Sequence, residues 1–324
     1  MIGSYRIVVR NSLIRYDFEI RRNITIIKGD SATGKTTLIE MIQDYYENGT
    51  SSGVELTCKK VCSVLSGRDW KTLLTSMNDR IIFIDEGNDF VLTDEFARTA
   101  QKSDNYYVIV TREGLVNLPY SAEEIYGIRE SGKYGSLRQT YNELYHIYGE
   151  ELYYGAVTPD KVIVEDSNSG FQFYDELSKN KDWTVVSANG KSNVFSESIK
   201  CGDDLKLLVI ADGAAFGAEM DRMVKLIQSR KNLVLYLPES FEWIILKSGI
   251  LAGDKKIDTI LESPQNYVES SKYFSWERYF TTLLVEETKD SYLRYSKKKL
   301  NPVYLQKNIQ AKICGTMVGI KLTE

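Results

Sequence analysis

Along the first part of the chain, apolar and polar residues alternate in short runs that predict strands, and segments at helical spacing separate these runs. Tyr5–Arg10 and Leu13–Ile20 alternate on either side of Asn11-Ser12, which predicts a β-hairpin. The alternation of strand and helix that follows predicts right-handed crossovers and a parallel sheet. Further strands are expected within Ile24–Ile27, Val54–Val64, Arg80–Ile84 and Tyr106–Val110, and helices from Lys35 onward and over Asp69–Met77 and Thr93–Ser103.

A second alternation of predicted strands and helices begins at Lys161, after a tyrosine-rich stretch. The stretch from Leu115 to about Glu150 is interpreted as an arm between two domains, with a helix over Leu137–Tyr148. A boundary near Thr158-Pro159 gives domains at residues 1–157 and 158–324. In the second domain, strands are expected over Val162–Glu165, Trp183–Val186, Leu205–Ala211 and Asn232–Leu237, and helices over Gly170–Leu177, Glu219–Ser229, Phe241–Ser248 and Trp276–Val285.

Composition indicates a soluble globular protein and excludes several classes of site. The chain has 324 residues, of which 43% are hydrophobic and 27% charged, and a net charge of -4, so nothing global favours nucleic acid. No apolar run approaches the length of a membrane span, and we expect a cytoplasmic protein with no membrane partner. The four cysteines (Cys58, Cys62, Cys201 and Cys314) are interpreted as reduced thiols, with a Zn²⁺ site as the alternative. His146 is the only histidine, which nearly excludes histidine-based metal sites and catalytic pairs.

A phosphate-binding loop is predicted between the strand at Ile24 and the helix at Lys35. Residues 29–36 read GDSATGKT and fit G-x-x-x-x-G-K-[ST] between a strand and a helix; the alternative is a glycine-containing turn that matches by accident. Lys35 is expected to place its charge on the outer phosphates, and the Thr36 hydroxyl to bind Mg²⁺. The nucleotide, ATP or GTP, is expected to contact Gly29, Asp30, Ser31, Ala32, Thr33, Gly34, Lys35, Thr36 and Thr37.

Two acidic residues follow the apolar run Ile81–Ile84 and resemble the end of the Walker B strand of P-loop ATPases. The resemblance implies that Asp85 holds the hydrated Mg²⁺ and that Glu86 polarises the attacking water. An unbroken apolar run suits a strand that is covered on both faces of a parallel sheet. The alternative is a buried strand that ends in solvated carboxylates.

The N-terminal hairpin that leads into the phosphate loop resembles the N-terminal edge of ABC-type ATPases. These carry a switch histidine after the strand that corresponds to Tyr106–Val110, and Arg112 takes that place here. Arg112 is expected either to touch the γ-phosphate or to pair with a carboxylate. Residues 65–68 (LSGR) resemble the ABC signature LSGG but lack its second glycine, so a sandwich dimer is not established and a homo-oligomer stays open.

The second domain resembles the TOPRIM fold of topoisomerases, primases and overcoming-lysogenization-defect (OLD) nucleases. Glu165 ends its first strand and Asp212 its third, which are the places of the family's general acid or base and of its Mg²⁺-binding D-x-D motif. Ala214 stands where the family has the second aspartate, and Asp166 where it has a glycine. One missing carboxylate lowers metal affinity and puts nuclease activity in doubt.

Glu239 is the candidate to replace the missing carboxylate. In the family order the third strand lies between the first and the fourth, so Glu165, Asp212 and Glu239 would share one rim and hold a divalent ion. The alternative is that Glu239 caps the helix that begins at Phe241. The run Lys297-Lys298-Lys299 is expected to be solvated, with a phosphate contact as the other reading.

The sequence as a whole predicts a P-loop NTPase sheet with an N-terminal hairpin, followed by a Rossmann-like, TOPRIM-like α/β domain. The function expected from the resemblance is that of an Mg²⁺-dependent ATPase, with Lys35, Glu86 and Arg112 in catalysis, whose nucleotide state regulates the second domain in nucleic-acid processing or anti-phage defence. Two alternatives remain: an inactive TOPRIM-like scaffold that binds a nucleic acid or a partner protein and keeps a structural nucleotide, or a P-loop kinase.

Overall fold

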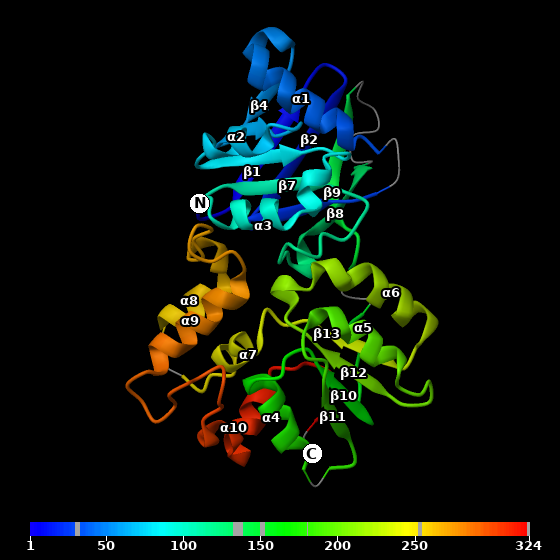
Figure 1. Cartoon of the computed structure of the whole chain (residues 1–324), viewed down its shortest axis with the longest axis vertical. Coiled ribbons are helices and arrows are strands. Elements are labelled where there is room, and N and C mark those ends of the chain that lie inside the picture. The colour runs from blue at the N-terminus through cyan, green and yellow to red at the C-terminus, as the bar shows by residue number, and fades with distance from the viewer. Residues whose placement is uncertain (30–32, 132–138, 150–152, 180, 252–254, 323–324) are drawn as a thin grey trace. The chain divides into compact units, whose positions relative to one another are not determined.

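The chain forms two compact α/β units in a computed structural model that describes residues 1–29, 33–131, 139–149, 153–179, 181–251 and 255–322. The first unit comprises Met1–Ile147 together with Ser263–Phe274, and the second comprises Tyr148–Glu262 together with Ser275–Glu324 (Figure 1). The first contains a large, mostly parallel sheet and the second a smaller, entirely parallel one. The prediction of an α/β fold with two parallel sheets is therefore confirmed.

In the first unit, the described residues form a nine-stranded sheet in the order β4-β1-β2-β9-β8-β3-β7-β6-β5. The strands β8-β3-β7-β6-β5 are parallel, and β1 and β2 form the predicted antiparallel hairpin. The strands are β1 (Tyr5–Arg10), β2 (Ile14–Ile20), β3 (Ile24–Ile27), β4 (Glu55–Thr57), β5 (Val61–Val64), β6 (Arg80–Ile84), β7 (Tyr106–Val110), β8 (Ile125–Glu130) and β9 (Thr140–His146). The α-helices of this unit are α1 (Lys35–Asn48), α2 (Trp70–Thr75) and α3 (Asp94–Gln101).

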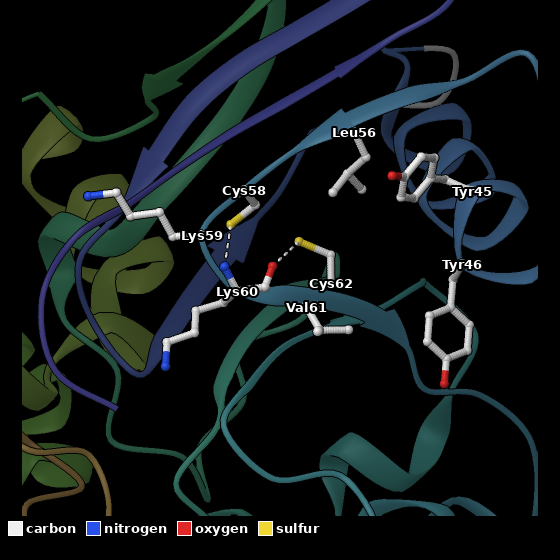
Figure 2. A pocket seen from close by; sticks show the side chains of 8 residues that line it. All are labelled: Tyr45, Tyr46, Leu56, Cys58, Lys59, Lys60, Val61 and Cys62. Carbon is white, nitrogen blue, oxygen red and sulfur yellow. Dashed lines mark hydrogen bonds between the residues drawn. The ribbon is translucent and has the colours of Figure 1, made fainter. Parts of the chain in front are cut away.

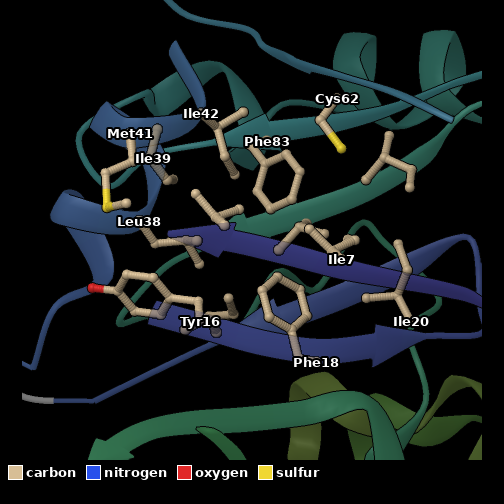
Figure 3. Packing of buried hydrophobic residues seen from close by; sticks show 14 of the residues in the cluster. Ile7, Tyr16, Phe18, Ile20, Leu38, Ile39, Met41, Ile42, Cys62 and Phe83 are labelled. Carbon is tan, nitrogen blue, oxygen red and sulfur yellow. The ribbon is translucent and has the colours of Figure 1, made fainter. Parts of the chain in front are cut away.

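The central strands of the first sheet are buried on both faces, which explains their unbroken apolar sequences. On one face, Leu38 and Ile42 of α1 belong to a buried cluster with Ile7 and Phe83 (Figure 3). On the other face, Phe96 of α3 packs edge-on against Tyr107, with ring centroids 5.7 Å apart. Thr93 caps α3 by accepting a hydrogen bond from the Phe96 N–H.

The helix predicted over Leu137–Tyr148 is wrong, because the described part of this segment is strand β9. It pairs antiparallel with β8, so that Tyr126 lies opposite His146. The sequence Thr140–His146 is rich in tyrosine and has a threonine, residue types that favour a pleated surface. The single strand predicted over Val54–Val64 is two strands, β4 and β5. They are the first and the last strand in the order of pairing, and they do not pair with each other. The tyrosine-rich arm is therefore partly an element of the first sheet.

The division between the units falls at Ile147/Tyr148, ahead of the boundary predicted at Thr158-Pro159. Tyr153 belongs with the second unit because its carbonyl accepts a hydrogen bond of 3.1 Å from the Leu235 N–H of β13 (Leu233–Tyr236). Ser263–Phe274, although late in the sequence, belongs with the first unit. There the N-terminal ammonium of Met1 donates to Ser270 Oγ at 2.8 Å. Contacts between residues so far apart in sequence leave no local signal.

The second unit has a parallel sheet in the order β11-β10-β12-β13. The third of these strands in the sequence lies between the first and the fourth, as expected. Its strands are β10 (Lys161–Val164), β11 (Thr184–Ser187), β12 (Leu207–Ile210) and β13. Its α-helices are α4 (Ser169–Ser178), α5 (Lys191–Ile199), α6 (Met220–Ser229), α7 (Phe241–Lys247), α8 (Lys255–Glu262), α9 (Trp276–Thr288) and α10 (Lys307–Cys314). None of the helices in the described ranges is long and apolar enough to cross a membrane.

Candidate functional site

The carboxyl ends of three parallel strands bring the predicted nucleotide residues to one edge of the first sheet. Strand β7 stands between β3 and β6, with Ile27 opposite Val110 and Ile109 opposite Ile84. The residues that follow these strands are therefore neighbours: Lys28-Gly29 after β3, Arg112 shortly after β7, and Asp85-Glu86 after β6. This is the edge at which open parallel sheets place their ligands.

Lys35 is held inside the predicted phosphate loop. Its ammonium donates to the Gly29 carbonyl at 2.8 Å and to Thr33 Oγ1 at 3.0 Å, and the residue is buried. Gly29 and Gly34 have φ values of 137° and 86°, in the region that favours glycine. Thr36 is exposed and Thr37 is half-buried in the first turn of α1. Asp30, Ser31 and Ala32 lie outside the described residues.

Tyr16 of the N-terminal hairpin supports this loop from outside the motif. It is 1% exposed, and its hydroxyl donates to the Gly34 carbonyl at 2.8 Å. A Cβ atom at position 34 would lie 2.7 Å from that hydroxyl and would displace Tyr16, and the φ of Gly34 itself disfavours any other residue. The alternation of β2 places Tyr16 on the same inward face as Phe18, and a buried phenol needs a partner. These two features of the sequence could have identified Tyr16 as a residue that supports the loop.

Glu86 and Arg112 form an ion pair of 2.6 Å between Oε1 and Nε. Their side chains are 37% and 59% exposed, so the pair lies in solvent and can separate at little cost. Of the two roles expected for Arg112, pairing with a carboxylate is the one observed. Asp85 accepts a hydrogen bond of 2.8 Å from the Glu86 N–H through Oδ1, and this orients the carboxylate at the end of β6.

Asn88 also lies at this edge of the first sheet, and the sequence did not predict it. Its side-chain N–H donates to the Asp85 carbonyl at 2.9 Å, and its Oδ1 accepts from the Gly67 N–H at 3.2 Å. The LSGR segment after β5 is thereby tied to the loop after β6. Thr36 and Asp85 together offer hydroxyl and carboxylate oxygens, the donor atoms that Mg²⁺ prefers.

In the second unit, two of the three predicted carboxylates meet at the rim of the sheet. Glu165 follows β10, and its Oε2 accepts a hydrogen bond of 2.8 Å from the Asp212 N–H. Burial raises the pKa of Glu165 to about 7. Burial also raises the pKa of Asp212, and the neighbouring carboxylates of Glu277 and Glu165 raise it further. The structure thus brings Glu165 and Asp212, both half-buried, together at this rim.

A lysine and two glutamates of the C-terminal part complete this rim. Lys297 Nζ lies 2.6 Å from Glu277 Oε1 and 3.7 Å from Glu242 Oε1. Burial alone would lower the pKa of Lys297, but Glu242 and Glu277 raise it overall. The expectation of a solvated lysine run needs correction at Lys297, which is half-buried because carboxylates distant in sequence pair with it. The sequence held no signal for this, since Glu242 and Glu277 each open an ordinary helix.

The described residues of the second unit do not assemble the three-carboxylate site that the sequence predicts. Among the described residues, no group of three or more His, Cys, Asp or Glu side chains could hold a metal ion, so Glu239 does not form a three-carboxylate site with Glu165 and Asp212. The Glu239 carbonyl instead accepts from the Ala214 N–H at 3.4 Å. Two ammonium groups accompany the carboxylates: Lys297, and Lys191, which donates to the Ala215 carbonyl at 3.0 Å. The two lysines therefore offset part of the negative charge at this rim.

We expect Glu165→Gln to stabilise the protein more at pH 8 than at pH 5. A carboxyl group whose folded pKa is about 7, above its ordinary 4.5, binds more protons folded than unfolded between those values. Stability that depends on the protonated form is therefore lost as pH rises through that window. The amide, which does not ionise, should gain about 1–2 kcal/mol over the parent at pH 8. Thermal melting at both pH values checks this.

The matched control is Glu176→Gln, which removes an exposed carboxylate paired with Lys179 on the surface of α4. It should change the melting temperature by a similar small amount at both pH values. An equal effect of Glu165→Gln at pH 5 and pH 8 would show that Glu165 ionises normally in the folded protein.

Compared with known proteins, the chain matches no protein-family model and no curated protein sequence.

Proposed function

We propose that the first unit binds ATP through the Gly29–Thr36 loop, hydrolyses it slowly with Mg²⁺, and uses its nucleotide state to act on the second unit. One observation carries the proposal. The buried Lys35 ammonium lies within hydrogen-bond distance of Gly29 O and Thr33 Oγ1, at the start of α1 and on the sheet edge that also carries Asp85 and Glu86. A positive helix end beside a lysine-containing glycine loop favours phosphate.

The residues of the chain divide the proposed work between binding and chemistry. Lys35 exchanges its loop contacts for phosphate oxygens, while Tyr16 keeps the backbone of Gly34 in place. Thr36 and Asp85 would hold Mg²⁺, which offsets the charge of the phosphates when bound. Glu86 orients and polarises the attacking water once it leaves Arg112, and Arg112 is then available to the phosphates.

For the second unit we propose a binding scaffold in preference to a metal-dependent nuclease. The Lys297 ammonium stands between Glu277 and Glu242, and Ala214 lacks the oxygens of the carboxylate it replaces. Lysines that offset part of the negative charge of this rim lower its attraction for a divalent cation. The scaffold would take a nucleic acid or a protein as its partner.

Turnover of ATP with Mg²⁺, measured with and without DNA or RNA, tests the proposal when strand cleavage is followed in the same samples. We expect inorganic phosphate to be released and every nucleic-acid strand to remain intact. Cleaved strands would contradict the scaffold assignment for the second unit. Transfer of the γ-phosphate to an acceptor, with no free phosphate, would instead identify a kinase.

A further inference from the structure

Two cysteines of the first unit lie against a pocket that the proposed ATPase chemistry does not use. Cys58 follows β4 and Cys62 belongs to β5, and both line a cavity of about 330 Å³ (Figure 2). The end of α1 forms another wall through Tyr45 and Tyr46. Cys58 is half-buried, so it is reachable from solvent, whereas Cys62 belongs to the core beneath it.

The surroundings of Cys58 favour its thiolate. The Lys60 N–H donates to Cys58 Sγ at 3.5 Å, and the Cys62 thiol donates to the Lys60 carbonyl at 3.9 Å (Figure 2). The neighbouring Cys62 side chain, followed by the backbone N–H groups of Lys60 and Lys59, lowers the pKa of Cys58 to about 7. The adjacent Cys58, followed by burial, raises the pKa of Cys62 and favours its protonated thiol. Cys58 and Cys62 thus line one pocket on either side of Lys60, and the half-buried Cys58 is the sulfur that an oxidant reaches first.

The other two cysteines have surroundings of a different kind. Burial raises the pKa of Cys314 to about 12. Cys201 is buried, and its thiol donates to the Glu197 carbonyl at 3.3 Å. Both belong to the second unit, and they provide internal references of ordinary buried thiols.

We propose that Cys58 and Cys62 form a peroxide-sensitive dithiol, in which Cys58 is oxidised first and Cys62 then closes a disulfide. The Cys58 thiolate attacks one oxygen of hydrogen peroxide, the O–O bond breaks, and with one proton from solvent the products are Cys58 sulfenic acid and water. The Cys62 sulfur then attacks the Cys58 sulfur. The S–O bond breaks, the hydroxyl leaves with the Cys62 proton as a second water, and the disulfide encloses residues 59–61.

The dithiol lies away from the proposed nucleotide edge, so the two assignments can fail separately. Cys62 is the second residue of β5 and pairs with Ile81 near the start of β6. The proposed nucleotide edge is at the opposite, carboxyl ends of these parallel strands, where Ile84 precedes Asp85. Oxidation of the thiols is therefore measurable whether or not ATP binds.

Peptide mapping of the full-length protein after treatment with hydrogen peroxide tests the proposal. Trypsin cleaves after Lys59 and Lys60, so Cys58 and Cys62 fall in separate peptides, residues 36–59 and 61–68. We expect these peptides to be joined without reductant, with the loss of two hydrogens, and to separate after reduction. In the untreated protein, iodoacetamide should modify Cys58 at least about tenfold faster than Cys201 or Cys314, with a half-maximal rate near pH 7.

Single substitutions separate the roles of the two sulfurs. Cys62→Ala should stop the reaction at Cys58 sulfenic acid, which a dimedone adduct on residues 36–59 reports. Cys58→Ser should leave Cys62 unmodified, and Cys201→Ala, the control, should still form the joined peptides. The proposal is overturned if peroxide joins no peptides in the parent protein, or if Cys58 reacts with iodoacetamide no faster than Cys314.

Discussion

Replacement of Lys35 by alanine is expected to weaken ATP binding about tenfold to a hundredfold. The lysine would make charge-assisted hydrogen bonds to the outer phosphates, and the loss of such a contact costs about 1.5–3 kcal/mol. In the structure the same ammonium ties Gly29 O to Thr33 Oγ1, so the variant also loses an organiser of the loop. Calorimetric titration with ATP and Mg²⁺ measures the change.

The matched control for this experiment is Lys71→Ala. Lys71 is an exposed lysine of α2 that pairs with Glu95 on the surface. It should bind ATP as the parent does, and both variants should melt cooperatively. A Lys35→Ala protein that keeps the parent's affinity for ATP would show that the GKT segment is only a turn between strand and helix.

Replacement of Glu86 by glutamine is expected to slow ATP hydrolysis about 10²- to 10⁴-fold while ATP still binds. The amide keeps the shape of the side chain but is a poor base for the attacking water. It also gives up the ion pair with Arg112, an exposed contact whose loss costs little in stability. Single-turnover release of phosphate, with binding measured on the same preparation, separates the two effects.

Arg112→Ala is the companion variant, because it releases Glu86 without removing it. If Arg112 contacts the phosphates during hydrolysis, this variant also loses turnover. If its only role is to pair with Glu86, turnover stays at the level of the parent or rises. Hydrolysis by Glu86→Gln at the parent's rate would place the water-activating group elsewhere on the sheet edge.

Residue patterns predicted the first sheet well wherever one periodicity dominated. The apolar run before Asp85 specified a strand covered on both faces, and the alternation in the N-terminal hairpin specified its pairing. The segment at Thr140–His146 was misassigned because its tyrosines fit either an amphipathic helix or a pleated surface, and only pairing with β8 decides between them. Helix α5 was not predicted, because its serine- and asparagine-containing sequence has little helical signal.

Site residues could be predicted from the sequence where a local motif marks them, and not where their partners are distant in sequence. Motif residues such as Lys35, Asp85 and Glu86 lie where their spacing and strand ends placed them. Residues that act through distant partners escaped prediction, since no local pattern links Lys297 to Glu242. The rim of the second sheet was predicted to gather three carboxylates, but the structure gathers carboxylates and lysines. Charge balance between distant segments is decided only on folding.

The measurement that tests the central assignment most directly is the equilibrium binding of adenine nucleotides to the unmodified chain. If the Gly29–Thr36 loop holds the outer phosphates, ATP should bind at one site per chain, ADP should also bind, and AMP should bind far more weakly because it lacks those phosphates. Chelation of Mg²⁺ should weaken ATP binding, since Thr36 and Asp85 would then lose their shared ion. No binding of ATP at millimolar concentration, or equal binding of AMP and ATP, would contradict a phosphate-binding role for this loop.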